Sequence, residues 1–427
     1  MTSVGRDGER RRPAWPRPPA PAPAGRRVTP FEIFFDLVFV FALTRIMALI
    51  GPEATPTTMG QGLILLVLLW FAWSSYTWLG NHTRAEVGVV RGGFLVAMAA
   101  LFVAALAMPE AWTPGPGLDG PLLVALAYVL LRVVHLALYH WAAAGVPRLR
   151  ARIRFFAAVS AAGWVPLLLG ALVAGAAHAV LWVLAFVIEI GGQRLSYARR
   201  GAWPLRSASH FTERHGLVLI IALGESVVAA GVGAASAVTA LPVLGVALVG
   251  FAVTVCLWWL YFDRVAPAAA GVLAAATGDR RDRIAADAYS QTHLLLITAV
   301  IYLALGIEQV LAHVAGAHGG DGHAGGAALS WSASVALYGG AALYLGGRLL
   351  FLRLTGQPVP PAQPAVAVLT LLLLPLGVLL PPAAALAVLA LLLLAAVAAE
   401  RLRGGRPRQQ LSGTGGVSPP ARRGRRG

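Results

Sequence analysis

The sequence has 427 residues, of which 58% are apolar and only 12% are charged. Soluble domains average about 25% charged residues, so this composition excludes an ordinary soluble protein and indicates a multi-pass membrane protein. The formal net charge of +16 comes from arginine, because the chain has no lysine. The arginines lie at the two ends of the chain and between apolar runs, which is typical of membrane topology, and we expect no nucleic-acid partner.

The chain divides into two polar tails and one long apolar region. Residues 1–29 are rich in Pro and Arg and residues 401–427 are rich in Arg, so both are predicted to be disordered tails. Residues 30–400 form the predicted transmembrane domain. A helix needs about 20 mostly apolar residues to cross a bilayer. Twelve stretches predict an all-α transmembrane bundle of about 12 helices: 31–50, 60–79, 88–108, 121–143, 154–174, 177–195, 214–233, 241–262, 286–312, 330–351, 365–380 and 383–400.

The last two of these stretches contain prolines that interrupt helices. Pro375 lies within the first, and Pro381 and Pro382 separate it from the second. Proline removes a backbone donor and clashes with the preceding turn, so this pair is also compatible with a helical hairpin or a re-entrant segment.

Arginine alternates between the predicted loops. The amino tail and the segments after the second, fourth, sixth, eighth and tenth helices carry Arg, as does the carboxyl tail. The intervening loops carry none: 51–59, 109–120, 175–178, 234–240 and 313–329. Because loops rich in Arg stay in the cytoplasm, we predict that both termini are cytoplasmic and that the protein spans the cell membrane many times.

The first apolar stretch, residues 30–50, carries Glu32, Asp36 and Arg45. On an insertion scale a central Asp or Arg costs about 2.5–3.5 kcal/mol, so this helix is only marginally suited to lipid alone. Glu32 and Asp36 are four residues apart and share one face, whereas Arg45 lies about half a turn round from Asp36. The stretch is therefore either a packing helix with internally paired charges or part of an ion or substrate path.

The seventh stretch contains a carboxylate near the middle of the predicted membrane. Glu225 follows His215 by ten residues, or about 15 Å along a helix. Gly224, Gly231 and Gly233 would let another helix approach closely. Glu225 is the strongest candidate for proton or cation binding, and the alternative is a neutral side chain hydrogen-bonded within the bundle.

Other predicted helices carry further ionisable residues. Arg132 and His135 lie on one polar stripe of the fourth helix with two tyrosines. Arg132 requires an acidic partner, for which Asp36, Glu189 and Glu225 are all candidates. The ninth helix contributes His293 and Glu308. For these secondary positions, structural pairing and contact with an ion or solute are both open readings.

Enzyme and metal motifs are mostly lacking. His210 and His215 are five residues apart, whereas a zinc-binding helix needs two His four apart. Cys256 stands alone and can form no internal disulfide. We therefore predict no catalytic residues, no metal site and no cofactor, with an intramembrane enzyme using His135, His215 and His293 as a remote alternative.

A weak internal match divides the chain into halves. An offset of 180 residues places Phe31 and Val38 on the identical residues Phe211 and Val218. Two six-helix repeats, 30–210 and 211–400, would follow a plan known in transporters. Chance matching of apolar residues is the alternative.

Three motifs resemble one family. FEIFFDLVFVFALTRI at 31–46, ERHGLVLIIALGES at 213–226 and LGIEQ at 305–309 resemble the bacterial low temperature requirement protein A family, over roughly residues 28–400. Arg45 departs from the family, which often has Gln there. The resemblance implies a membrane protein connected with growth in the cold and brings no substrate or reaction. The residues that match family motif positions are Glu32, Phe35, Asp36, His215, Gly216, Gly224 and Glu225.

The leading functional hypothesis is a secondary transporter or permease for an unknown small solute or ion, with proton or cation coupling. Asp36 and Glu225 would be its ionisable groups, and Arg132 a counter-charge. The alternative is a non-transporting accessory protein that supports the membrane at low temperature. Besides the lipid bilayer, a homo-oligomeric partner is left open.

Overall fold

The computed structural model describes residues 19, 22–23, 25–115, 119–235, 237–318 and 328–404. Within these ranges the chain is helical without β-strands, and eleven helices are long and apolar enough to cross a membrane. Large apolar side chains on their outer faces, such as Leu248 and Leu391, are exposed in a way that suits contact with lipid. The prediction of an all-α, multi-pass helical bundle is confirmed.

The first half of the chain forms six long helices. Their bounds are α1 (Pro30–Ile50), α2 (Pro56–His82), α3 (Gly88–Ala107), α4 (Gly120–Ala142), α5 (Pro147–Gly170) and α6 (Ala176–Arg200). A 3₁₀ turn, η1 (Met108–Glu110), extends α3.

The second half is less regular. It comprises α7 (Ala208–Ala234), α8 (Leu241–Phe262), α9 (Val265–Ala275), α10 (Gly278–Arg283), α11 (Thr292–His318), α12 (Trp331–Ser334), α13 (Gly340–Leu354), α14 (Ala362–Leu372), α15 (Leu376–Leu379) and α16 (Pro382–Gly404). Two π-helical segments join neighbours into longer rods: η2 (Ile284–Gln291) precedes α11, and η3 (Val335–Gly339) links α12 to α13.

The eleventh predicted helix, 365–380, is wrong as a single span. The chain there forms two short helices, α14 and α15, separated by a turn that ends at Pro375. Because Pro375 has no backbone N–H and its ring clashes with the preceding turn, α14 stops at Leu372. The twelfth stretch does form a full-length helix, α16, so eleven long spans replace the twelve expected.

The starts of α1 and α7 are determined by their caps. Thr29 caps α1 in a reciprocal capping box with Glu32, and Pro30 occupies the first turn. Ser207 caps α7, accepting a hydrogen bond from the His210 N–H. Helix α7 therefore begins six residues before the predicted 214, which brings the segment 208–213 inside the helix.

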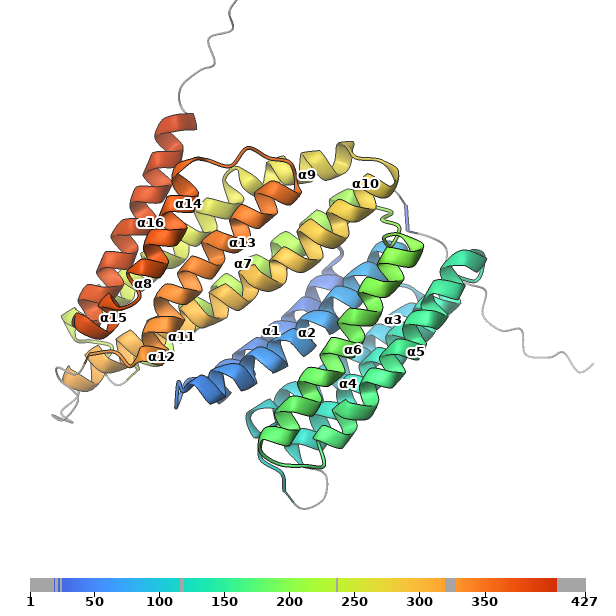
Figure 1. The fold of residues 1–427 in the computed structure, drawn as a ribbon, viewed down its shortest axis with the longest axis horizontal. Coiled ribbons are helices and arrows are strands. Elements are labelled where there is room, and N and C mark those ends of the chain that lie inside the picture. Colours follow the sequence, from blue (N-terminus) through green and yellow to red (C-terminus); the bar gives the residue numbers. More distant parts are fainter. Residues whose placement is uncertain are drawn as a thin grey trace, which may run out of the picture.

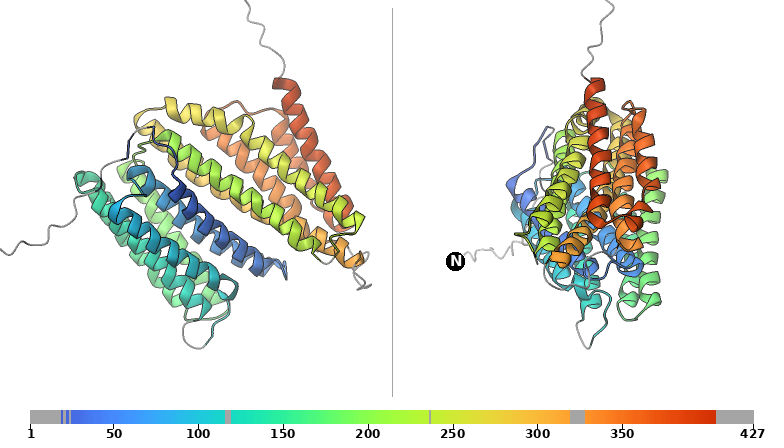
Figure 2. Two further views of the ribbon diagram at one scale, coloured as in Figure 1. Left: turned by 180° about the vertical axis from the view of Figure 1, so that it is seen from behind. Right: turned by 90° about the vertical axis from the view of Figure 1, so that its left-hand side faces the viewer.

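The helices form two groups that meet along α1, α2, α7 and α11. Figure 1 shows α1–α6 on one side and α7–α16 on the other, and the reverse view in Figure 2 shows α1 beside α7. The most extensive helix contact joins α7 and α11. At Gly233 an added Cβ would lie 2.5 Å from the backbone oxygen of Glu308, so this contact requires glycine.

The two halves share a packing pattern. Helix α1 packs on α2 and α3, as α7 packs on α8 and α11. Arg132 of α4 pairs with Glu189 of α6, and Arg348 of α13 pairs with Glu400 of α16. Each of these arginines follows a tyrosine by four residues. A twofold repeat predicts such matches, although the division at residue 210 remains a prediction.

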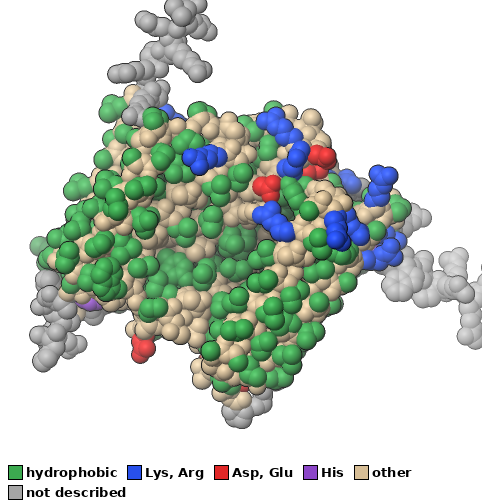
Figure 3. All heavy atoms as spheres, viewed as in Figure 1, with side chains coloured by type: hydrophobic (Ala, Val, Ile, Leu, Met, Phe, Trp, Pro, Cys, Tyr) green, Lys and Arg blue, Asp and Glu red, His purple; other side chains and the backbone are tan. Residues whose placement is uncertain are grey.

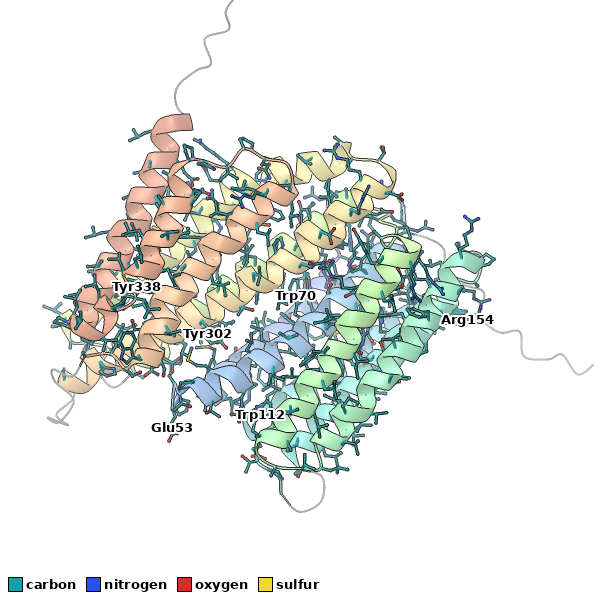
Figure 4. All side chains as sticks on the ribbon, in the orientation of Figure 1. Glu53, Trp70, Trp112, Arg154, Tyr302 and Tyr338 are labelled. Atoms are coloured by element: carbon teal, nitrogen blue, oxygen red, sulfur yellow. The ribbon has the colours of Figure 1, made fainter. Side chains whose placement is uncertain are left out.

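Arginine side chains gather at one end of the bundle (Figure 3). Arg152 donates to Ala202 O and Arg281 donates to Leu205 O, which ties α5, the α6–α7 connection and α10 together there. In Figure 4, Arg154 marks this arginine-rich end and Glu53 marks the opposite one. The predicted tail residues 405–427 and most of 1–24 lie outside the described part.

Candidate functional site

A buried ladder of charges joins α1 to α7. Glu32 and Asp36 are four residues apart on α1, and His210 and Arg214 are four apart on α7. Arg214 Nη2 lies 2.7 Å from Asp36 Oδ1, and His210 Nε2 lies 2.8 Å from Glu32 Oε1. All four side chains are fully buried. The two i, i+4 pairs therefore face each other in register across the contact between α1 and α7.

Further groups complete this ladder at the arginine-rich end. Arg26 Nη2 lies 2.9 Å from both Glu32 Oε2 and Glu86 Oε2. The indole Nε1 of Trp73 on α2 donates to Asp36 Oδ1 at 2.7 Å. The carboxylates thus have cationic or donor partners, as a buried charge requires. Residues 26–29, which the sequence analysis assigns to the tail, are part of the folded bundle.

Two histidines lie side by side next to the ladder. The rings of His215 on α7 and His293 on α11 are 4.9 Å apart between centroids. Each Nδ1 faces the carbonyl four residues earlier, at 2.8 Å from Phe211 O and 2.9 Å from Tyr289 O. His293 Nε2 therefore accepts from the Tyr261 hydroxyl at 2.7 Å. Within the described ranges, no cluster of His, Cys, Asp and Glu could hold a metal ion.

A second ionic cluster lies within the first half. Arg132 Nε lies 3.6 Å from Glu189 Oε1, and the Tyr128 hydroxyl donates to Glu189 Oε2 at 2.6 Å. Arg132 also donates to Ser75 Oγ and Ser160 Oγ. Of the three acidic partners that the sequence allows for Arg132, the structure selects Glu189.

A pair of acidic side chains lies between α1, α7 and α11, toward the end opposite the arginines. Glu225 is 3% exposed and its Oε2 accepts from Thr44 Oγ1 at 2.9 Å. Glu308 is half-buried against Gly51, where an added Cβ would be 2.8 Å from its Oε1. Glu225 meets α1 at Thr44, and Glu308 meets it about two helical turns further along, at Gly51. Among the described residues neither has an ion-pair partner.

An apolar layer separates this acid pair from the charge ladder. Phe39 and Leu43 of α1 and Leu219 and Ala222 of α7 are fully buried between the two. The candidate residues therefore fall into separate groups and do not form one site. There are four groups. Glu32 lies with Asp36, and His215 lies with His293. Arg132 lies with Glu189 and near His135, and Glu225 lies with Glu308.

Sequence reasoning missed the cations that neutralise α1. Arg214 is the first residue of the predicted helix 214–233, and Arg26 falls within the predicted tail 1–29. One signal could have found Arg214, because His210 and Arg214 repeat the four-residue spacing of Glu32 and Asp36. Arg45, which stood out in the sequence, is half-buried and makes no ion pair with the described carboxylates.

Comparison with known proteins gives two findings. A family model described as bacterial low temperature requirement A protein matches residues 27–398. A protein of Rhizobium meliloti (strain 1021), described as uncharacterized, is 28% identical over 339 residues, which cover 77% of this chain and 78% of that protein. The range matched by the family model, residues 27–398, contains Glu32, Asp36, His210 and Arg214 together with the histidine pair and the acid pair.

Proposed function

The chain belongs to the bacterial low temperature requirement A family, and from its buried charges we propose that it is an ion-coupled secondary transporter of the cell membrane. The observation that carries the proposal is the acid pair of Glu225 and Glu308. Every other buried carboxylate described above has a cationic partner, whereas this pair has none among the described residues.

Two uncompensated carboxylates inside a membrane protein favour capture of a positive ion. An isolated buried carboxylate is strongly disfavoured by the loss of hydration, and a second one nearby adds repulsion. Uptake of a proton or a small cation at this pair relieves both effects. Thr44 supplies a neutral oxygen beside Glu225. Intramembrane carboxylates of this kind commonly mark ion pathways.

The apolar layer lies on one side of the acid pair and therefore determines toward which end of the bundle an ion is blocked. We take the arginine-rich end as cytoplasmic, because arginine is retained on that side. An ion at the acid pair is then separated from the cytoplasm by the packed side chains of Phe39, Leu43 and Leu219. Its release inward requires α1 and α7 to move against each other. Their contact is also where the two halves of the chain meet, as a rocking mechanism requires.

The test is charge movement on a solid-supported membrane carrying the reconstituted protein, after jumps of pH, Na⁺ or K⁺. We expect a current in the wild type that falls at least tenfold in Glu225→Gln and in Glu308→Gln. Glu53→Gln is the matched control, because it removes a carboxylate that is exposed outside the bundle. Its current should equal that of the wild type.

The same experiment separates transport from an accessory role. If Glu225→Gln lowers the melting temperature of the purified protein while no ion produces a current in the wild type, the acid pair is structural. The accessory reading would then replace the proposal. A well-folded Glu225→Gln that carries undiminished current would also contradict the role given to the pair.

A further inference from the structure

A cavity of about 250 Å³ lies between the two halves of the protein. It is bounded by α2, α4, α5, α6, the α6–α7 connection, η2 and α11. Trp70, which lines it, lies between α11 and α6 in Figure 4. None of the acid pair or the charge ladder lines this cavity, so it is separate from the ion site proposed above.

Five large apolar aromatic side chains form part of the walls. Trp70, Phe71 and Trp78 come from α2, Phe156 comes from α5, and Trp203 comes from the α6–α7 connection. The two α2 indoles are held in place by η2, because Trp70 Nε1 donates to Ser290 O at 2.8 Å and Trp78 Nε1 donates to Ser290 Oγ at 3.1 Å. Short π-helical segments often occur at functional sites, and this one forms a wall of the cavity.

Two polar side chains that line the cavity each have an atom without a hydrogen-bond partner among the described residues. The Tyr139 hydroxyl makes no hydrogen bond with any described residue, although Tyr139 is only 2% exposed. His135 is 3% exposed; one of its ring nitrogens lies near the Ser75 backbone, and the other has no hydrogen-bond partner among the described residues. A buried polar group without a partner costs about 1–3 kcal/mol, so a ligand that bonds to these groups recovers stabilisation.

The charges around the cavity favour an uncharged ligand. None of the described residues that line it is a carboxylate, which disfavours a cation. Its one cationic lining residue, Arg194, is already bonded to Asp287 and to Gln291. An anionic ligand would have to compete with Asp287 and Gln291 for the Arg194 guanidinium.

We propose that this cavity binds a small, uncharged organic molecule with a flat apolar body and one hydrogen-bonding end. The body stacks among the indole and phenyl rings, and the polar end meets Tyr139 and His135. A space of this size accommodates a molecule somewhat larger than benzene, which fills an engineered cavity of about 150 Å³. A lipid chain would instead leave the two polar groups unsatisfied. The inference concerns binding alone and does not depend on transport.

The experiment measures the binding of 2-naphthol to the purified full chain in detergent by equilibrium dialysis. The variants are Ala286→Phe, which fills the cavity from η2, and Tyr139→Phe, which removes only the hydroxyl. Ala161→Phe is the matched control, because it adds the same ring on the exposed face of α5. Naphthalene serves as the ligand without a polar end.

We expect saturable binding of 2-naphthol by the wild type and by Ala161→Phe, and loss of that binding in Ala286→Phe. Tyr139→Phe should weaken 2-naphthol about five- to tenfold and leave naphthalene unchanged, as loss of one hydrogen bond predicts. If Ala286→Phe fails to fold, the comparison of 2-naphthol with naphthalene in Tyr139→Phe still tests whether the ligand binds at the Tyr139 hydroxyl.

Two results would overturn the proposal. The first is that the wild type and a folded Ala286→Phe bind 2-naphthol equally. The measured binding would then be explained by partition of 2-naphthol into the detergent. The other is displacement of 2-naphthol by dimyristoyl phosphatidylglycerol with no effect of Tyr139→Phe, which would identify the cavity as a lipid site.

Discussion

Arg214 and Asp36 form a fully buried ion pair across the contact between α7 and α1, with 2.7 Å between Nη2 and Oδ1. Arg214 also lies 3.8 Å from Glu32, so one guanidinium is shared by two carboxylates. This pair joins the two halves of the chain at a contact that apolar side chains alone could also have formed. A buried ion pair contributes little net stability compared with an apolar replacement, but breaking it on one side is costly.

Replacing only one partner should therefore destabilise the protein strongly. We expect Arg214→Gln to lower the free energy of unfolding by about 3–5 kcal/mol, because Asp36 and Glu32 then lose a buried counter-charge. The double variant Asp36→Asn with Arg214→Gln should lose clearly less than the sum of the two single changes. Denaturation of the purified protein in detergent measures all three.

The control for this prediction is an exposed ion pair on the same two segments. Arg27 lies 3.3 Å from Glu213, and its side chain is 81% exposed. Arg27→Gln should cost less than about 1 kcal/mol. If Arg214→Gln is as stable as Arg27→Gln, the ladder is not the ionic connection described here.

Neighbouring glycines on α7 should respond in opposite ways to the same substitution. At Gly233 an added methyl meets the Glu308 backbone at 2.5 Å, whereas at Gly231 nothing lies within 4 Å. Gly233→Ala should destabilise by about 1–3 kcal/mol through overpacking between α7 and α11. Gly231→Ala should be neutral or stabilise by up to about 1 kcal/mol, because alanine is the better helix former. Melting temperatures of the two variants give the comparison, and a stable Gly233→Ala would contradict the close packing.

Cysteine labelling tests the orientation in the membrane. Cys256 is the only native cysteine and is 2% exposed, so the wild type should not react with a membrane-impermeant maleimide. Glu53→Cys and Arg154→Cys place thiols at opposite ends of the bundle. On intact cells we expect only Glu53→Cys to be labelled, and Arg154→Cys to react after permeabilisation. The reverse pattern would place the arginine-rich end outside.

Much of the architecture follows from the sequence alone. The lengths of the apolar runs predict the long helices, because about 20 residues cross the hydrocarbon core and each run must satisfy its own backbone hydrogen bonds. The alternation of arginine predicts which helix ends lie together, as they do in the structure. The sequence also pointed to Glu32, Asp36 and Glu225, since acidic residues inside apolar helices are rare.

The tertiary structure decided how these charges are paired. Helical periodicity places a residue on a face of its own helix, but not which neighbouring helix meets that face. Thus Arg132 could have met any of three carboxylates and meets Glu189, while Asp36 meets Arg214. Within the described part of the chain, Glu225 and Glu308 have no cation beside them and the Tyr139 hydroxyl has no partner, and both features arise only when distant helices pack together.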